Sequence, residues 1–144
     1  MRDVPVIPSS AGLPQKTAEP GNVVFFDNTA EGRAAAQREE KPLLLFFYLP
    51  DCSNSKRMLE TVFCNAEIQQ LARRFVCVKI DGSKETEYCK GLNIKGFPTT
   101  LLLSPQGKEV QRLSGGQTAD QLALQMHLTI QSTAARTTAF GVVR

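Results

Sequence analysis

The chain has 144 residues, a formal net charge of +3 and a pI near 8.8. That length suits one domain with a hydrophobic core, and 42% apolar with 22% charged residues are ordinary for a globular protein. The Lys and Arg residues are dispersed, so no nucleic-acid partner is expected, and no apolar stretch approaches the ~20 residues that would span a membrane directly.

The two ends of the chain differ in composition from the middle. Residues 1–21 hold half of the 8 prolines, which predicts an extended, flexible tail that could serve as an arm docking on a partner. Residues 22–131 are predicted as the folded domain and residues 132–144 as a C-terminal tail. The first residues lack a signal-peptide core. If the chain was instead trimmed from a longer exported precursor, the protein would lie in the periplasm or the secretory pathway, which is the location we favour.

The first half of the domain alternates strand and helix patterns. Val23–Phe26 is a short predicted strand, and Asn28 with Glu31 forms a capping-box pattern for a helix to about Glu40. The run Leu43–Tyr48 is apolar on both faces, as expected of a central parallel strand. Two further helical patterns follow, one from Ser53 and one capped by Asn65, with apolar residues at helical spacing at Met58, Leu59, Val62, Phe63, Ile68, Leu71, Ala72 and Phe75.

The second half continues the alternation and ends in a hairpin and a helix. Thr118 and Gln121 form a second capping box for that last helix, which is predicted to bury Ala119, Leu122, Met126 and Ile130. The element order predicts an α/β fold with three layers, α/β/α, around a central mixed sheet. The remaining predicted elements are strands at Val76–Ile80, Thr99–Leu103 and Val110–Leu113, and a short helix at about Glu85–Lys90.

Cys52 stands where the central strand gives way to a helix. Unpaired N–H groups at a helix N-terminus favour an anion by ~0.3–1 kcal/mol when exposed and ~2 kcal/mol when partly buried. Hydrogen bonds from the first turn, with the Ser55 hydroxyl, add to this effect. The adjacent carboxylate of Asp51 opposes it. We therefore expect the pKa of Cys52 to lie modestly below that of a free thiol.

The other cysteines do not form a recognisable metal or disulfide pattern. No C-x-x-C or H-x-x-x-H pair is present, so neither a metal nor a cofactor is expected. Cys64 lies twelve residues beyond Cys52, ~18 Å along a continuous helix, whereas a disulfide needs Cα atoms within about 7 Å. Cys77 and Cys89 fit buried, inert positions, although a structural bridge among these three cysteines stays open. His127 is expected at the surface or in helix packing.

The strand before Cys52, the helix after it and the run Gly96-Phe97-Pro98-Thr99-Thr100 together resemble the thioredoxin superfamily over about Val23–Ile130. The chain is similar to bacterial thioredoxin-like proteins and to the anterior gradient branch of the disulfide-isomerase family, which has a C-x-x-S motif. The resemblance implies a thioredoxin fold, Cys52 as the nucleophile, and Pro98 as a cis proline facing it. It further implies client contacts at Asp51, Phe97, Pro98 and Thr99, and partners that are proteins carrying disulfides or thiols.

Three positions depart from the family pattern. Ser55 replaces the resolving cysteine, Asp51 replaces the usual tryptophan, and Phe46 replaces the buried acid that helps to deprotonate the resolving thiol. The joint loss of that thiol and its proton acceptor indicates a native monothiol or retired site rather than a laboratory substitution.

Three functional interpretations stay open at this point. The first is a monothiol thiol–disulfide oxidoreductase or isomerase in which Cys52 forms mixed disulfides that an external thiol, such as glutathione, or a second client cysteine releases. The second is a redox-inactive binding or structural module that keeps the groove at Phe97 and Pro98. The third is a dithiol enzyme trapped by a Cys-to-Ser change at position 55.

Overall fold

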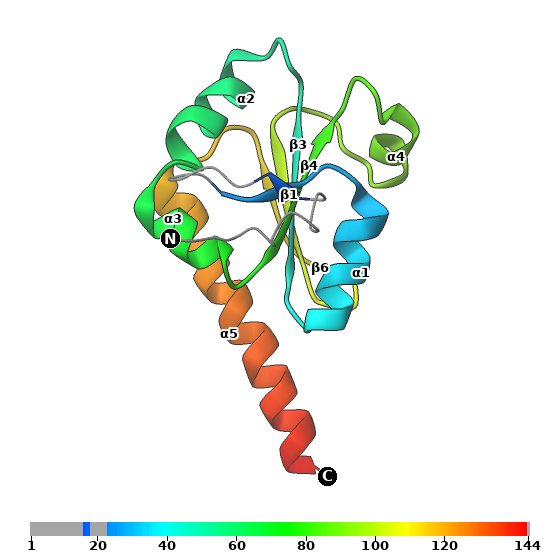
Figure 1. Ribbon diagram of the computed structural model, residues 1–144, viewed down its shortest axis with the longest axis vertical. Helices are drawn as coiled ribbons and strands as arrows, with labels where there is room; N and C mark the ends of the chain where they lie inside the picture. Colours follow the sequence, from blue (N-terminus) through cyan, green and yellow to red (C-terminus); the bar gives the residue numbers. More distant parts are fainter. Residues whose placement is uncertain (1–15, 18–22, 144) are drawn as a thin grey trace, which may run out of the picture.

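A computed structural model describes residues 16–17 and 23–143 and contains a central six-stranded mixed sheet (Figure 1). The strand order is β1-β2-β4-β3-β5-β6. The strands are β1 (Lys16–Thr17), β2 (Phe25–Phe26), β3 (Leu43–Tyr48), β4 (Val76–Asp81), β5 (Thr99–Leu103) and β6 (Glu109–Ser114). The helices are α1 (Thr29–Glu39), α2 (Ser53–Arg57), the π-helical turn η3 (Met58–Val62), α3 (Ala66–Ala72), α4 (Thr86–Gly91) and α5 (Ala119–Val143).

Strand β3 lies in the middle of the sheet. It pairs in parallel with β4 from Leu43 to Tyr48 and antiparallel with β5. Successive side chains of a strand point to opposite faces, so Leu44 and Phe46 enter one hydrophobic cluster while Leu45 and Phe47 enter the other. The predicted central strand is therefore confirmed, and its uninterrupted apolar run reflects burial on both faces.

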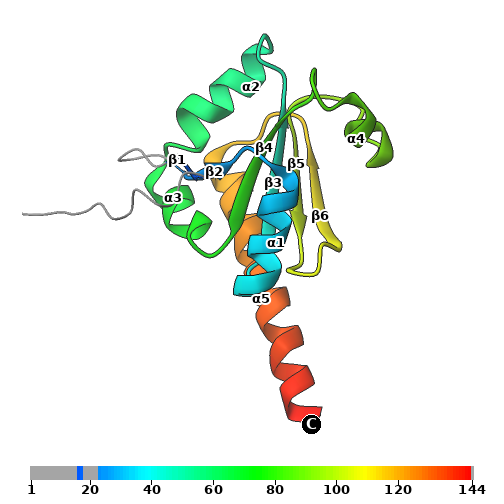
Figure 2. The same cartoon turned by 45° about the vertical axis from the view of Figure 1, so that its right-hand side comes forward.

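Helices cover both faces of the sheet (Figure 2). The helices α1 and α4 bury residues against the cluster that contains Leu45 and Phe47. On the opposite face, η3, α3 and α5 pack over Leu44 and Phe46. This arrangement is the three-layer α/β/α thioredoxin fold that the sequence predicted.

Side-chain caps fix where three of the helices begin, as the sequence patterns indicated. The Oδ1 of Asn28 accepts from the Glu31 N–H at 2.9 Å. The Oδ1 of Asn65 accepts from the first turn of α3 at 2.9 and 3.2 Å. Thr118 and Gln121 exchange both capping-box bonds, at 3.0 and 3.1 Å. Each cap satisfies backbone N–H groups that have no partner within the helix.

The N-terminal part of the chain differs from expectation at two points. Strand β2 covers Phe25–Phe26 and leaves Val23 and Val24 outside it. Lys16–Thr17, within the segment predicted as a tail, pair antiparallel with β2 as β1. The rest of segment 1–21 lies outside the described residues, so its role as a docking arm stays a prediction.

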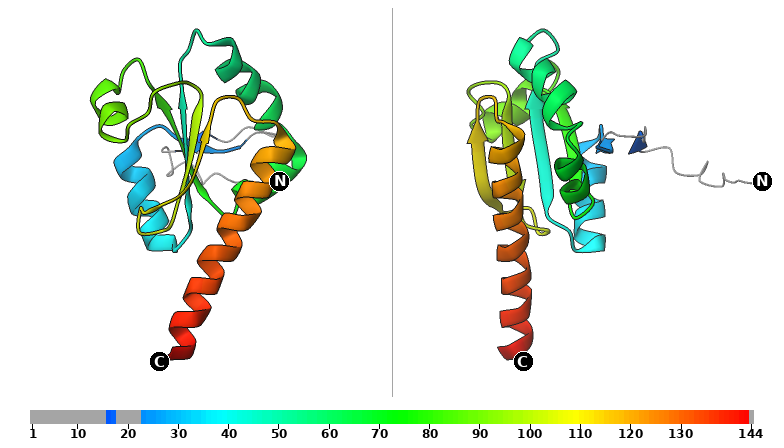
Figure 3. Two further views of the ribbon diagram at one scale, coloured as in Figure 1. Left: turned by 180° about the vertical axis from the view of Figure 1, so that it is seen from behind. Right: turned by 90° about the vertical axis from the view of Figure 1, so that its left-hand side faces the viewer.

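The C-terminal segment continues as helix. Residues 132–143, predicted as a tail, extend α5 to Val143, and this end of the helix runs on past the sheet (Figure 3). The local reason is composition: this segment, rich in Ala and Thr, contains no proline that would end the helix. Neither α5 nor any other helix in the described ranges has both the length and the apolar character needed to cross a membrane.

Candidate active site

The turn between β3 and α2 lies at the top of the molecule in Figure 1. It places Cys52 at the start of α2. Cys52 has extended backbone angles (φ −87°, ψ 121°) and is the N-cap residue of α2. Its thiol is partly exposed. The sulfur is therefore accessible from solvent and adjacent to the first-turn N–H groups, as the sequence predicted.

The pKa of Cys52 is lowered from its ordinary value. The largest cause is a hydrogen bond from the backbone N–H of Ser55, followed by one from the Ser55 hydroxyl. Desolvation opposes these bonds, and the Asn54 N–H adds to them. The direction agrees with the sequence-based expectation, but the adjacent carboxylate of Asp51, which we expected to oppose the shift, is not among its causes.

Ser55 is fully buried and its hydroxyl is oriented by a second bond. Its Oγ accepts a hydrogen bond from the Leu49 N–H at 3.3 Å. Because the oxygen accepts this bond through a lone pair, the hydroxyl proton is available for donation to the Cys52 sulfur. The side chain that stands in place of a resolving thiol thus links the end of β3 to the nucleophile.

The Phe97–Pro98 peptide lies opposite Cys52 and is cis, as the resemblance implied. The Sγ of Cys52 is 3.8 Å from the Phe97 carbonyl oxygen, to which the protonated thiol donates. The carbonyl oxygen of Pro98 accepts from the Gly115 N–H at 2.8 Å, and the Thr99 hydroxyl donates to the Gly96 carbonyl at 2.7 Å. Thr99 is buried, whereas Asp51, the residue before Cys52, is exposed. The client contacts expected at Asp51, Phe97, Pro98 and Thr99 stay a prediction.

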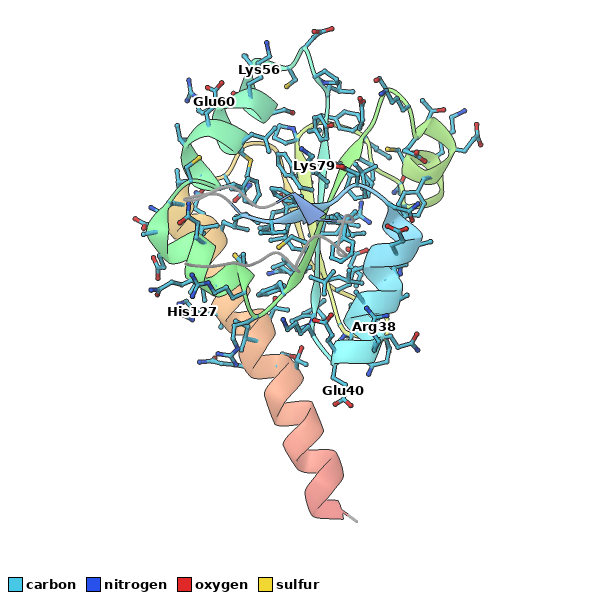
Figure 4. All side chains as sticks on the ribbon, in the orientation of Figure 1. Arg38, Glu40, Lys56, Glu60, Lys79 and His127 are labelled. Atoms are coloured by element: carbon cyan, nitrogen blue, oxygen red, sulfur yellow. The ribbon has the colours of Figure 1, made fainter. Side chains whose placement is uncertain are left out.

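A second surface feature, which the sequence did not indicate, borders the active-site helix. A pocket of ≈ 450 Å³ lies between α2 and the loop that precedes α5, and its lining includes Asn54, Arg57 and Gln117. On the outer side of the active-site helix and the π-turn, Lys56 and Glu60 face solvent (Figure 4). Gly116 lies close to α2 here, since a Cβ built on it would be 3.9 Å from the Cβ of Asn54.

The remaining cysteines and His127 lie apart from this site. Cys64 is exposed, while Cys77 and Cys89 are buried. Burial raises the pKa of Cys89, which suits an inert thiol. His127 is exposed and lies 3.6 Å from a carboxylate oxygen of Glu67. Within the described part of the chain, no group of three or more His, Cys, Asp or Glu residues could hold a metal ion.

The fold and this site define a thioredoxin-like domain. The family model of that description matches residues 29–129, and the chain belongs to this family. It is 29% identical over 113 residues to a protein disulfide-isomerase of Hordeum vulgare, covering 78% of this chain and 21% of the relative. It is also 29% identical over 101 residues to the thiol:disulfide interchange protein DsbD of Cronobacter sakazakii, covering 66% of this chain and 18% of the relative.

Solved structures support the same fold. A thioredoxin from Thermus thermophilus superposes with a TM-score of 0.69 at 20% identity, covering 77% of this chain and 90% of that one. At this identity the likeness concerns the fold. The chain spans about a fifth of the length of the curated relatives named above.

Removing the Ser55 hydroxyl is expected to raise the pKa of Cys52. In a Cys64→Ala background, which leaves Cys52 as the one thiol of the described residues that is not buried, Ser55→Ala should move the midpoint of iodoacetamide alkylation to higher pH. The backbone N–H of Ser55 remains, so only part of the lowering is lost. Ser53→Ala, an exposed neighbour in the same turn, is the matched control. An unchanged midpoint in Ser55→Ala would show that the hydroxyl does not stabilise the thiolate.

Proposed function

We propose that this protein carries out monothiol thiol–disulfide exchange, and disulfide isomerisation, on protein clients through Cys52. The observation that carries the proposal is the position of the sulfur. It is partly exposed at the start of α2, has a lowered pKa, and lies 3.8 Å from the Phe97 carbonyl oxygen. A thiolate is the attacking species in exchange, and an accessible sulfur beside a backbone carbonyl can meet an extended client chain.

The first step forms a mixed disulfide. The Cys52 thiolate attacks one sulfur of a client disulfide; a bond forms between Cys52 and that sulfur, the client S–S bond breaks, and the second client sulfur leaves as a thiolate that takes a proton from solvent. Hydrogen bonds from the N–H groups of Ser55 and Asn54 stabilise the attacking thiolate. Ser55 offers no thiol to attack the new bond.

Release therefore depends on a thiol from outside the motif. A second client cysteine can attack the mixed disulfide as a thiolate, forming a different client disulfide and returning Cys52 as a thiolate. Two thiolates and one disulfide are present both before and after the two steps, so the client is isomerised without net oxidation or reduction. A small thiol such as glutathione would instead attack the Cys52 sulfur, release the client with both former disulfide sulfurs as thiols, and form a disulfide with Cys52 that a second glutathione cleaves to give oxidised glutathione. The names of the relatives, a disulfide-isomerase and a disulfide interchange protein, support this class of chemistry.

Covalent capture of a client tests the proposal. A peptide with one internal disulfide, incubated with the reduced protein and quenched with acid, should give an adduct whose mass maps to Cys52. The adduct should disappear in Cys52→Ala and persist in Cys64→Ala, since Cys64 is the second exposed thiol. Scrambled ribonuclease should also regain activity faster with the wild-type protein than with Cys52→Ala.

The contrary outcome is equally definite. An adduct found at Cys64 alone, or no adduct on either thiol, would contradict the exchange proposal. The redox-inactive binding module would then be the better interpretation, with the Phe97–Pro98 region serving as a groove without chemistry.

A further inference from the structure

Gly82 lies under the ring of Phe97, and a side chain would not fit between them. Gly82 directly follows β4 and is buried. A Cβ built on it would overlap Cε1 and Cζ of Phe97, well inside the 3.0 Å that real Cβ atoms keep, and would lie 3.3 Å from Cδ1. The constraint is one of space, because Gly82 is not among the positive-φ glycines.

The same residue is joined to the strand that carries the nucleophile. The N–H of Gly82 donates to the Tyr48 carbonyl at 2.8 Å, at the end of β3 and four residues before Cys52. Strands β3 and β4 are in register there, with Tyr48 opposite Asp81. The position of Gly82 relative to the Cys52 turn is therefore fixed by the backbone of two adjacent parallel strands.

Phe97 connects this glycine to the reacting sulfur. Its half-buried ring packs against the cluster that contains Phe47 and Ile80, while its carbonyl oxygen is 3.8 Å from the Sγ of Cys52. On the far side, the Pro98 carbonyl is held by the Gly115 N–H at 2.8 Å. The packing of the ring on one side and the bond to Pro98 on the other together define the position of the Phe97 carbonyl relative to the sulfur.

We propose that Gly82 is a positioning residue for the exchange site: the space it leaves seats the Phe97 ring and thereby sets the Phe97 carbonyl oxygen opposite the Cys52 sulfur. This inference deepens the proposed function and rests on it for its effect on exchange. A methyl group on residue 82 has to push the ring by about 1 Å or more to reach ordinary van der Waals contact. Misplacements of that size in a reaction centre can reduce rates by up to about a hundredfold.

The contact between the Cys52 sulfur and the Phe97 carbonyl oxygen predicts a second measurable effect, on the pKa of Cys52. The Phe97 carbonyl accepts from the protonated thiol; it is not among the causes of the lowered pKa of Cys52, but a hydrogen bond to the neutral form of an acid acts to raise the pKa. Displacing the carbonyl removes this effect, so the pKa of Cys52 should fall. Gly82→Ala is thus expected to shift the alkylation midpoint to lower pH while slowing exchange with a client. Destabilisation of the fold alone would not produce both changes.

The experiment uses Gly82→Ala, Phe97→Leu and the double variant, all in the Cys64→Ala background. Gly82→Ala should slow mixed-disulfide formation with the disulfide peptide about tenfold or more and lower the alkylation midpoint. Phe97→Leu removes Cε1 and Cζ, the atoms that the methyl group overlaps, so the double variant should recover both the rate and the midpoint toward those of Phe97→Leu alone. Circular dichroism confirms that each protein is folded.

Several outcomes would overturn the proposal. They are an unchanged rate and midpoint in folded Gly82→Ala, a slower rate with an unchanged midpoint, or no recovery in the double variant. If Gly82→Ala does not fold, Phe97→Ala removes the same contact from the other side, and an unchanged midpoint in that variant would overturn the proposal. Failure of the proposed function would give a different result. The wild-type protein would then form no mixed disulfide, whereas the alkylation midpoint of Cys52 would still respond to the position of the Phe97 carbonyl.

Discussion

Replacing Ser55 with cysteine is expected to convert the protein into a dithiol reductant of client disulfides. The buried Ser55 hydroxyl is hydrogen-bonded to the Cys52 sulfur, so a thiol introduced at this position lies within reach of a mixed disulfide on Cys52. It would attack the Cys52 sulfur, release the client as a thiol and leave a disulfide between positions 52 and 55. The client is reduced by two electrons and the protein is oxidised by two.

The expected effect on the mixed disulfide is large. Intramolecular attack by a well-oriented thiol has an effective concentration far above that of any free thiol, so the lifetime of the adduct should fall about a hundredfold or more. Burial raises the pKa of a thiol and Phe46 supplies no carboxylate to deprotonate it. The lifetime should therefore shorten further as the pH is raised, which a quench-and-mass experiment across pH would measure.

A matched variant separates the effect of the position of the new thiol from the effect of adding any second thiol to this turn. Asn54→Cys adds a thiol on an exposed residue of the same turn, two positions from Cys52, where side chains do not face each other on a helix. It should leave the adduct as long-lived as in the wild-type protein. Equal lifetimes in Ser55→Cys and Asn54→Cys would show that residue 55 is not oriented toward the reacting sulfur.

Replacing Phe46 with alanine is expected to cause the largest loss of stability. Phe46 is completely buried on β3. Its ring centroid lies 4.8 Å from that of Phe63 in an edge-on contact, and it stacks on Tyr48 at 6.1 Å. Truncating a buried phenylalanine removes transferred apolar surface and leaves a cavity, so the free energy of unfolding should fall by about 3–5 kcal/mol. Urea denaturation with an unchanged m-value would measure the loss.

The control for this prediction truncates a large apolar side chain that is exposed on the surface. Leu124 on α5 is 56% exposed, and Leu124→Ala should change the free energy of unfolding by less than about 0.5 kcal/mol. The Phe46 ring carries no charge and no hydrogen-bonding group for the thiol, so the alkylation midpoint of the folded variant should stay in place. A shifted midpoint with little loss of stability would instead mean that residue 46 tunes the thiol.

Particular residues show which features local sequence patterns could predict. The run Leu43–Tyr48 gave the central strand with its observed bounds, because burial on both faces requires an unbroken apolar stretch. Asn65 and Thr118 gave helix starts, because a capping side chain acts within three residues of itself. The helical state of residues 132–143 was missed, since tail-like composition is a weak guide where no proline is present.

The sequence by itself determined the three-layer α/β/α arrangement, the position of Cys52 at a helix start and the lowered pKa of its thiol, because strand burial, helix capping and first-turn N–H groups act over a few neighbouring residues. The thioredoxin fold was implied by the resemblance that Cys52 and the run Gly96-Phe97-Pro98-Thr99-Thr100 carry. Only the tertiary structure decided that Ser55 joins Leu49 to the sulfur and that Gly82 makes room for Phe97. Gly82 and Phe97 are far apart along the chain and meet because β4 and the cis-proline loop converge beside Cys52. A space left empty by a missing side chain has no periodicity, so no local pattern could reveal it.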